Sequence, residues 1–288
     1  MASTQQLKQR ITSVKNTKQI TKAMEMVAAS KMRRAQEHAL KSRDFKELAR
    51  KILTRLSEVT DVSIHPLYVQ RPIKHRLHVF ITSDRGLAGA FNSNLFKAFM
   101  KELHQDLDDG AKSSVVVIGR KGARFINKLD GVEVVGVYEN VPELPSAKEI
   151  HPILRTVVSQ FNDESIDAAD ITYTHFKSSI SQVVMTERLL PAVFQEAEIS
   201  PDLGQAIVEP NTKQVLEQVT ERLIEVQLNQ AFNESQASEH SARMMAMKNA
   251  TDNAGDLIDD LTLEYNTARQ AAITQELAEI TGGAEAIN

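Results

Sequence analysis

The chain has 288 residues, of which 42% are hydrophobic and 25% charged, and its formal net charge is −4. It contains no cysteine, which excludes disulfides, thiolate metal sites and cysteine nucleophiles. The low aromatic content and the absence of tryptophan favour long helices over a thick hydrophobic core.

Proline and glycine divide the chain into three segments. Residues 1–65 contain neither, all eight prolines lie within 66–210, and residues 211–280 contain no proline and one glycine, Gly255. We therefore predict an N-terminal helix over 1–65, a mixed domain over 66–210 and a C-terminal helix over 211–288. The last helix would be about 105 Å long, against about 50 Å for a compact domain of this size, so it is expected to protrude.

In the N-terminal helix, apolar residues recur at spacings of three and four, which is typical of a buried helical face. The predicted stripes are Leu7, Ile11 and Val14, then Ile20, Met24 and Val27, then Phe45, Leu48, Ile52, Leu56 and Val59. Small residues at 28–30 stand beside flexible methionines. They indicate either ordinary coiled-coil packing or a surface that re-packs against a partner.

The middle segment alternates strand and helix patterns. Strands are predicted at 77–82, 114–118, 132–138 and 170–175, with an antiparallel edge strand at 182–189, and helices at 93–107, after Gly119 and at 148–161. This alternation predicts an α/β domain with a doubly wound, largely parallel, Rossmann-like sheet.

The loops of this sheet do not match a nucleotide-binding motif. Gly86 with Gly89, and Gly119 with Gly122, each form G-x-x-G, but neither completes G-x-G-x-x-G, and no P-loop motif occurs. We interpret these glycines as tight strand-to-helix turns. The adjacent Asp84 and Arg85 are predicted to order the loop or to contact a partner.

No catalytic or metal-binding pattern is found. The eight histidines lack metal-ligand spacing, and His75 and His78 are predicted to face solvent. No serine lies in a G-x-S-x-G context. No active site, metal or cofactor is therefore expected.

The C-terminal helix carries a heptad pattern, which predicts a left-handed coiled coil. Its predicted seam has one polar interruption, at Glu264, and comprises Met247, Ala250, Ala254, Leu257, Leu261, Glu264, Ala268 and Ala271. Residues 1–65 carry fourteen Lys and Arg against six Asp and Glu, whereas residues 211–288 carry five against thirteen. Opposite charge favours pairing of the two helices, although each charge run could be only a solvated face.

Three stretches resemble the gamma subunit of F-type ATP synthases: KQITKAMEMVAASKMRRAQ at 18–36, ITSDRGLAGAFNSNLF at 81–96, and residues 238–287, which include SARMMAMKNATDNAGDLIDDL. The resemblance implies an antiparallel coiled coil of the terminal helices with a central Rossmann-like α/β domain. It further implies a non-catalytic rotor shaft, one copy per complex, which couples proton-driven rotation of the c-ring to the catalytic beta subunits.

The resemblance also implies partners and contact residues. The coiled coil would enter the hexamer of alpha and beta subunits, and the α/β domain would contact epsilon and the c-ring. By position, Met24, Arg243, Gln270 and Thr274 resemble residues that contact beta, and Glu209 resembles one that faces the ring or epsilon.

The chain departs from some family members in having Ala88 where they carry cysteine, and it lacks a cysteine-bearing regulatory insertion, which rules out thiol control. The N-terminus shows neither a signal nor a transit pattern, and the longest apolar run is far below the ~20 residues that span a bilayer. We expect a bacterial protein peripheral to the cytoplasmic face of the inner membrane.

Two other classes of function remain open from the residues. A coiled-coil scaffold or nucleic-acid-binding protein could also have a basic helix, but this helix has almost no interleaved aromatic residues for base stacking, so no nucleic-acid partner is expected. An α/β enzyme with helical arms would need a cofactor site.

Overall fold

The computed structural model describes residues 4–58, 61, 65–143, 145–193 and 211–285. Its elements are α1 (Thr4–Ser57), a short 3₁₀ helix η2 (Pro66–Tyr68), β1 (His75–Ile81), α2 (Phe91–Asp108), β2 (Lys112–Ile118), α3 (Arg120–Ile126), β3 (Glu133–Tyr138), α4 (Ala147–Asn162), β4 (Ala168–Ser178), β5 (Ser181–Leu190) and α6 (Thr212–Glu285). Internal contacts divide the chain into two units: unit 1 holds residues 1–28 and 243–288, and unit 2 holds residues 29–242.

The predicted elements of the middle segment are all present, each within a few residues of its expected bounds. Both terminal segments are helical as predicted, although α1 ends at Ser57. In unit 2, Ile52 and Leu56 pack into the core as expected, whereas Leu48 is exposed. The predicted stripe members Phe45 and Val59 lie outside the residues whose side chains the structure describes.

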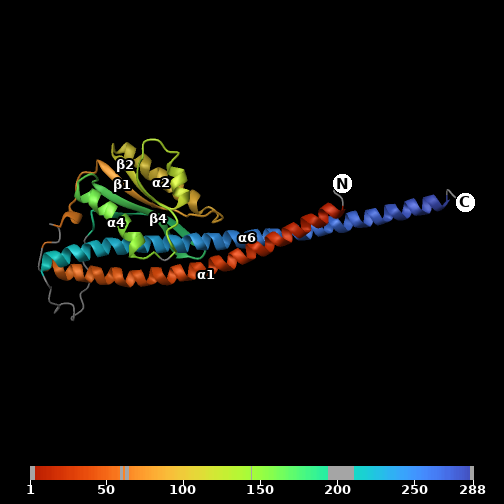
Figure 1. Ribbon diagram of the computed structural model, residues 1–288, viewed down its shortest axis with the longest axis horizontal. Helices are drawn as coiled ribbons and strands as arrows, with labels where there is room; N and C mark the ends of the chain where they lie inside the picture. Colours follow the sequence, from red (N-terminus) through yellow and green to blue (C-terminus); the bar gives the residue numbers. More distant parts are fainter. Residues whose placement is uncertain (1–3, 59–60, 62–64, 144, 194–210, 286–288) are drawn as a thin grey trace. The chain divides into compact units, whose positions relative to one another are not determined.

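Unit 2 is built on a five-stranded sheet of order β3-β2-β1-β4-β5, in which only β5 is antiparallel to its neighbour. Helices cover both faces of this sheet, with α2 and α4 on opposite sides (Figure 1). Alternate residues of β1 enter different cores: Leu77 and Val79 pack with α4 and α6, while Phe80 packs with α2 and α3. Burial on both faces explains the nearly continuous apolar runs of the strands.

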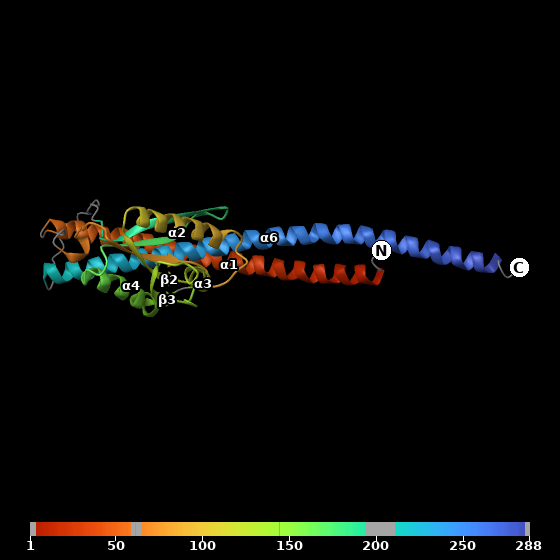
Figure 2. The ribbon, with the colours of Figure 1, turned by 90° about the horizontal axis from the view of Figure 1, so that it is seen from above.

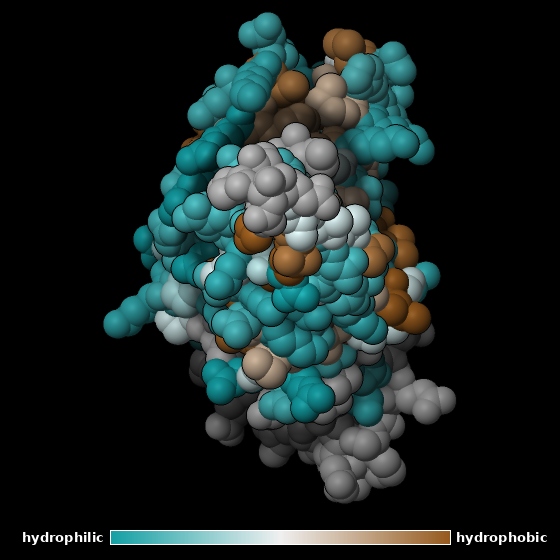
Figure 3. Space-filling view, turned by 90° about the vertical axis from the view of Figure 1, so that its right-hand side faces the viewer, coloured by the Kyte–Doolittle hydropathy of each residue, from teal (hydrophilic) through white to brown (hydrophobic). Residues whose placement is uncertain are grey.

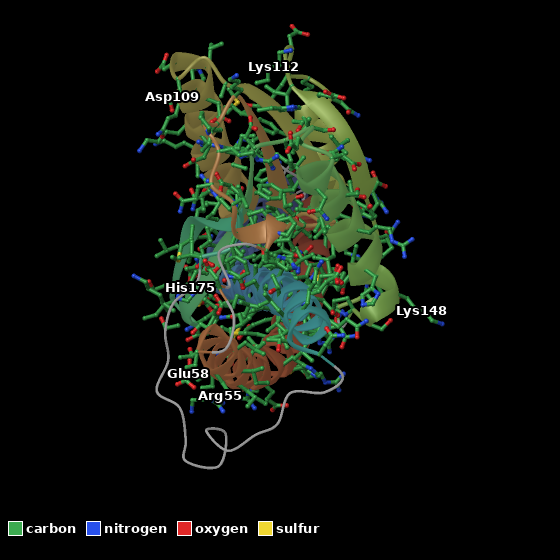
Figure 4. All side chains as sticks on the ribbon, turned by 90° about the vertical axis from the view of Figure 1, so that its left-hand side faces the viewer. Arg55, Glu58, Asp109, Lys112, Lys148 and His175 are labelled. Atoms are coloured by element: carbon green, nitrogen blue, oxygen red, sulfur yellow. The ribbon has the colours of Figure 1, made fainter. Side chains whose placement is uncertain are left out.

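Within unit 2, α6 is buried on almost every side between residues 231 and 241. Polar side chains of this stretch bond to the sheet. The Ser238 hydroxyl donates to the carbonyl of Thr174 at 3.0 Å, and Glu234 pairs with His175 of β4. His175 and the Arg55–Glu58 pair at the end of α1 are labelled in Figure 4. Unit 2 therefore holds α6 through hydrogen bonds as well as apolar packing.

The prediction for His78 is wrong, because this side chain is fully buried. Residue 78 alternates with the apolar core positions of β1, and α2 covers that face of the sheet as well. His78 Nε2 donates to Asp106 Oδ2 at 2.7 Å, and Ser113 donates to the same oxygen at 2.7 Å. Arg76 lies 2.8 Å from the other oxygen of Asp106. A charged group inside the unit thus joins β1, α2 and β2.

Burial by itself raises the pKa of the Asp106 carboxyl, but the hydrogen bonds from His78 and Ser113 and the positive charge of Arg76 outweigh it, so the pKa lies below its ordinary value of 3.8. The stabilisation from this carboxylate is therefore present above the ordinary carboxyl pKa and is lost as the pH falls through the lower folded-state value.

We expect Asp106→Asn to lower the free energy of unfolding at neutral pH by about 3 kcal/mol, because Arg76 and His78 lose the buried carboxylate they share and Arg76 keeps only the longer contact with Asp170, at 3.4 Å. The difference from the parent chain should be constant above about pH 5 and should shrink as the pH falls below the ordinary carboxyl pKa. Thermal and urea unfolding, followed by circular dichroism over a pH series, measure both quantities.

The matched control is Asp109→Asn, one turn along at the exposed end of α2. Its effect should stay within about 0.5 kcal/mol. An Asp106→Asn effect as small as this, or one that grows towards acid pH, would contradict the assignment.

Candidate partner-binding surface

In unit 1, α1 and α6 lie side by side (Figure 2). They run antiparallel, because Lys18 approaches Gly255 while Thr21 bonds to Thr251. A series of buried and half-buried residues of α6 recurs at spacings of four and three: Met247, Thr251, Ala254, Ile258, Leu261, Tyr265 and Ala268, with the half-buried Ala250 and Gly255 beside it. This heptad spacing is typical of a left-handed coiled-coil seam and confirms the predicted pairing of the helices.

Three of the eight predicted α6 seam residues are wrong, because Leu257, Glu264 and Ala271 are exposed. Met247, Ala254 and Leu261 are buried and Ala250 and Ala268 are half-buried, as expected. A second set of residues, one position further along, takes their place, since Ile258 and Tyr265 are half-buried. Glu264 is therefore not a polar interruption of the seam.

The α1 seam also differs from the prediction after its first stripe. Leu7 is buried and Ile11 and Val14 are half-buried, as expected, but Ile20 is 60% and Val27 55% exposed. Thr21 and Ala28 are buried instead. Thr21 and Ala28 continue the heptad that starts at Leu7. Extending that heptad along the helix would therefore have predicted these two positions, which hydrophobicity alone did not indicate.

The two sides of this coiled coil differ in chemistry. In an antiparallel pair, residues that flank the seam on the same side lie next to each other. One side, which we call the apolar flank, comprises Ile20, Met24 and Val27 of α1 with Ala250 and Leu257 of α6, while further along the same side lie the charged Arg10 and Glu264. The other, the charged flank, comprises Lys8, Lys15 and Lys22 with Asp252 and Asp259.

The predicted contact residues fall into two groups. Met24 is half-buried on the apolar flank, and Arg243, half-buried, begins the unit 1 part of α6. Gln270 and Thr274 are exposed and lie one turn apart, with the Thr274 hydroxyl donating to the Gln270 carbonyl at 2.9 Å. Arg243 and Gln270 are separated by about 40 Å along the helix, so one partner segment cannot touch both groups.

The last described turns of α6 have no cover. Every residue from 269 to 281 is exposed. Three of them, Ile273, Leu277 and Ile280, form an apolar stripe at spacings of four and three. Counting outwards from the Thr21–Thr251 contact, Thr4 of α1 lies opposite Ala268, so the paired region ends there. This stretch is the part of unit 1 most in need of a partner.

Asp84 orders the loop that follows β1. Its Oδ1 accepts hydrogen bonds from the backbone N–H groups of Arg120 at 3.0 Å and Asn140 at 3.1 Å. The Arg85 side chain is exposed. Asp84 therefore ties together three loops at one edge of the sheet, and its role as a partner contact, like that of Arg85, stays a prediction.

The glycines after β2 serve packing. Thr82 occupies the space beside them: a Cβ at Gly119 would lie 2.3 Å from the Thr82 carbonyl oxygen, and one at Gly122 would lie 2.6 Å from its hydroxyl. The Gly122 N–H donates to that hydroxyl at 2.8 Å. Protein atoms thus fill the position where a phosphate-binding loop needs open space, in agreement with the interpretation of these glycines as turns.

Among the described residues there is no group of three or more His, Cys, Asp or Glu side chains placed to hold a metal ion. Within the same ranges, none of the helices combines the length and apolar character that crossing a membrane requires. The face in Figure 3 is largely hydrophilic, with hydrophobic side chains in separate groups. Glu209 lies outside the described residues.

Comparisons with known proteins agree along the whole chain. A family model described as ATP synthase matches residues 3–287. The chain is similar to the ATP synthase gamma chains of two strains of Xylella fastidiosa, M23 and Temecula1, with 38% identity over 288 residues that cover all of both chains.

Solved structures show the same likeness. The chain is similar to one in the central stalk and c-ring structure of the Tetrahymena thermophila mitochondrial ATP synthase, with 27% identity and a TM-score of 0.62, covering 80% of this chain and 99% of that one. A chain of the Euglena gracilis mitochondrial ATP synthase, in rotational state 3, is 20% identical with a TM-score of 0.66, covering 99% and 94%. Because the Euglena chain is only 20% identical to this one, its likeness shows the fold alone.

We expect Gly122→Ala to destabilise unit 2 by about 1–3 kcal/mol, since the new methyl group meets Thr82 and Val117 at less than 3 Å. Gly255→Ala is the matched control within a helix, because only the flexible end of Lys18 opposes it. This control should be neutral or should stabilise by up to about 1 kcal/mol through helix propensity. Urea unfolding of the two variants measures both effects.

Thr82→Ala removes the atoms that the new methyl group meets and should recover part of the Gly122→Ala loss in the double variant. Equal effects of alanine at 122 and 255 would show that the close approach to Thr82 is unimportant.

Proposed function

Because the chain belongs to the family of ATP synthase gamma chains, the non-catalytic rotor subunits of the central stalk, we propose that it transmits rotation of a membrane c-ring to catalytic beta subunits. Proton flow drives the ring in this proposal. One copy of the chain stands in the central cavity of a hexamer of alpha and beta subunits, whose sites make or hydrolyse ATP.

The observation that carries the proposal is the uncovered end of α6. A single helix in water is stabilised mainly by burying an apolar stripe, yet Ile273, Leu277 and Ile280 lie on the surface of this chain. A partner that encloses the helix from several sides supplies the missing cover. A ring of subunits around a central cavity has that geometry, and Gln270 and Thr274 lie where it would meet the helix.

The apolar flank supports a second contact with the same hexamer. Ile20, Val27 and Leu257 are exposed large apolar residues from two helices on one side of the coiled coil. The charged flank on the other side presents lysines and aspartates to its surroundings. A shaft with two unlike sides offers different surfaces to successive subunits as it turns, which is what a rotor needs in order to drive three sites through different states.

Met24 and Arg243 belong to this second contact in the proposal. Met24 contributes a flexible thioether side chain, which can keep contact while its neighbours change. Arg243 contributes a guanidinium suited to a carboxylate or to carbonyl groups of a beta-subunit loop.

Unit 2 provides the contacts with the remaining partners, epsilon and the c-ring. Arg85 is exposed for such a contact, and Asp84 holds its loop in place through Arg120 and Asn140. Glu209 is proposed to face the ring or epsilon. The complex is placed at the cytoplasmic face of a bacterial inner membrane, with this chain peripheral to the bilayer.

We expect Arg243→Ala and Gln270→Ala to lower ATP turnover of the assembled complex by about tenfold, the effect of about 1.4 kcal/mol in the transition state. For Gln270→Ala the thermal unfolding midpoint of the isolated chain should change little, because Gln270 is exposed and its backbone hydrogen bond from Thr274 survives the change. For Arg243→Ala the loss of turnover should exceed the loss of stability. Steady-state hydrolysis and thermal unfolding are measured on the same preparations.

Gln275→Ala is the control for Gln270→Ala, because Gln275 is an exposed glutamine on the same helix that bonds to Glu279. It should leave turnover near the parent value. If the two main variants unfold more easily while turnover in the complex is unchanged, both residues have structural roles and the contact proposal fails.

A further inference from the structure

Two threonines form a hydrogen-bonded layer inside the seam of unit 1. Thr21 of α1 and Thr251 of α6 are both buried, and their hydroxyl oxygens lie 2.8 Å apart. Thr21 Oγ1 is also 3.1 Å from the Lys18 carbonyl oxygen, and Thr251 Oγ1 is 2.8 Å from that of Met247. Thr21 donates to Lys18, and Thr251 has one hydroxyl hydrogen, so the bond across the seam forms when Thr251 donates to Thr21 in place of Met247.

Other threonines of these helices behave differently. Thr12, Thr17, Thr262 and Thr267 are exposed, and each hydroxyl donates only to the carbonyl four residues earlier in its own helix. A local bond of this kind is enough to satisfy a threonine hydroxyl. The bond between Thr21 and Thr251 is thus a feature of the interface and is not needed by either helix alone.

The neighbouring layers show why this bond matters. Counting outwards from the threonine pair along antiparallel helices, Val14 lies opposite Ile258 and Ile11 opposite Leu261. Lys18 lies beside Ala254 and Gly255, where its amino group would be only 2.9 Å from a Cβ at 255. The small residues leave room for the lysine chain to pass out of the seam.

A shift of one helix by a heptad within unit 1 keeps an apolar seam but loses these matches, and it requires a local break in the helix, because α1 and α6 run unbroken into unit 2. In one direction Thr21 comes to lie opposite Ile258, and Lys18 opposite Leu261. Each threonine then keeps only the bond within its own helix and loses its partner across the seam, and the lysine meets a large side chain. Apolar residues such as Val14, Ile258 and Leu261 do not by themselves distinguish the two registers, because they recur every heptad.

We propose that Thr21 and Thr251 are positioning residues that set the axial register of the two helices in unit 1. Their hydrogen bond holds Met24 of α1 at a fixed height relative to Arg243 and Gln270 of α6. The inference goes beyond the proposed function, because it concerns how the shaft keeps its shape in the isolated chain as well as in a complex.

Because the chain has no cysteine, two introduced cysteines are the only residues to which a spin label attaches. Ser13→Cys and Ala272→Cys put one label on each helix at exposed positions. These sites are separated by about 20 Å along the axis in the observed register, and a one-heptad slip changes that separation by about 10 Å. Double electron–electron resonance of the full chain measures the distance distribution.

We expect a single distance in the otherwise unchanged chain. In the Thr21→Val/Thr251→Val variant, a second population displaced by about 10 Å should appear. The fraction of molecules in this displaced population should be roughly fivefold to tenfold larger than in the parent chain, which is the effect expected from the loss of one neutral hydrogen bond. Thr21→Ser/Thr251→Ser keeps both hydroxyls and should restore the single distance.

Thr17→Val/Thr262→Val is the matched control, since it makes the same change at exposed threonines of the same two helices. It should leave the single distance unchanged.

A single, unchanged distance in the Thr21→Val/Thr251→Val chain would overturn the proposal, whatever its stability. A second distance in the Thr17→Val/Thr262→Val control would overturn it as well, because register would then depend on threonine content in general. Neither result bears on the rotor function, since the measurement needs no partner subunit.

Discussion

The structure depends on how a helix of 74 residues finds cover for its apolar side. In unit 2 the sheet and α1 surround α6, and polar residues such as Glu234 and Ser238 bond to β4. In unit 1 the only described cover is the seam with α1, which leaves both flanks of the coiled coil exposed. Beyond residue 268 the described helix has no cover from this chain. Isolated helices are stable to the extent that they bury such a stripe, so the uncovered turns require a partner.

The loops at the carboxyl ends of β1 and β2 are closed by contacts within the chain. The sheet has the layout of a nucleotide-binding fold, but Thr82 fills the space beside Gly119 and Gly122, and Asp84 is held by backbone N–H groups. The charged cluster of His78, Asp106 and Arg76 is sealed between the sheet and α2, where it joins elements and meets no ligand. In unit 1, the features left exposed are surfaces for contact, which fits membership in the family of rotor subunits.

The helices, the strands and their order could be predicted from the sequence because proline and glycine punctuate it sharply and the period of apolar residues changes between segments. The exact seam could not. At Ile20 and Val27, and again at Leu257, two apolar stripes overlap one residue apart, and hydrophobicity favours the wrong one. The correct stripe contains Thr21 and Thr251, which are polar and whose burial is possible because their hydroxyls bond within their own helices and to each other across the interface. His78 was missed for a related reason, since its cover comes from α2, the next helix in the chain, and the sequence of β1 alone does not show which face that helix covers.

The candidate contact residues could be located only as far as their helices. The structure adds that Met24 and Arg243 lie far along the rod from Gln270 and Thr274, so in the proposed complex the two groups would make separate contacts. It also adds the apolar flank, which arises from two helices and has no signature in either segment alone.

The most direct measurement is reconstitution of this chain with matching alpha and beta subunits and Mg-ATP, reading stoichiometry by native mass spectrometry and hydrolysis in the same samples. The account predicts one copy of the chain for each hexamer and hydrolysis that rises when the chain is added. A hexamer that excludes the chain, or one whose hydrolysis does not respond to it, would contradict the assignment of this chain as the shaft.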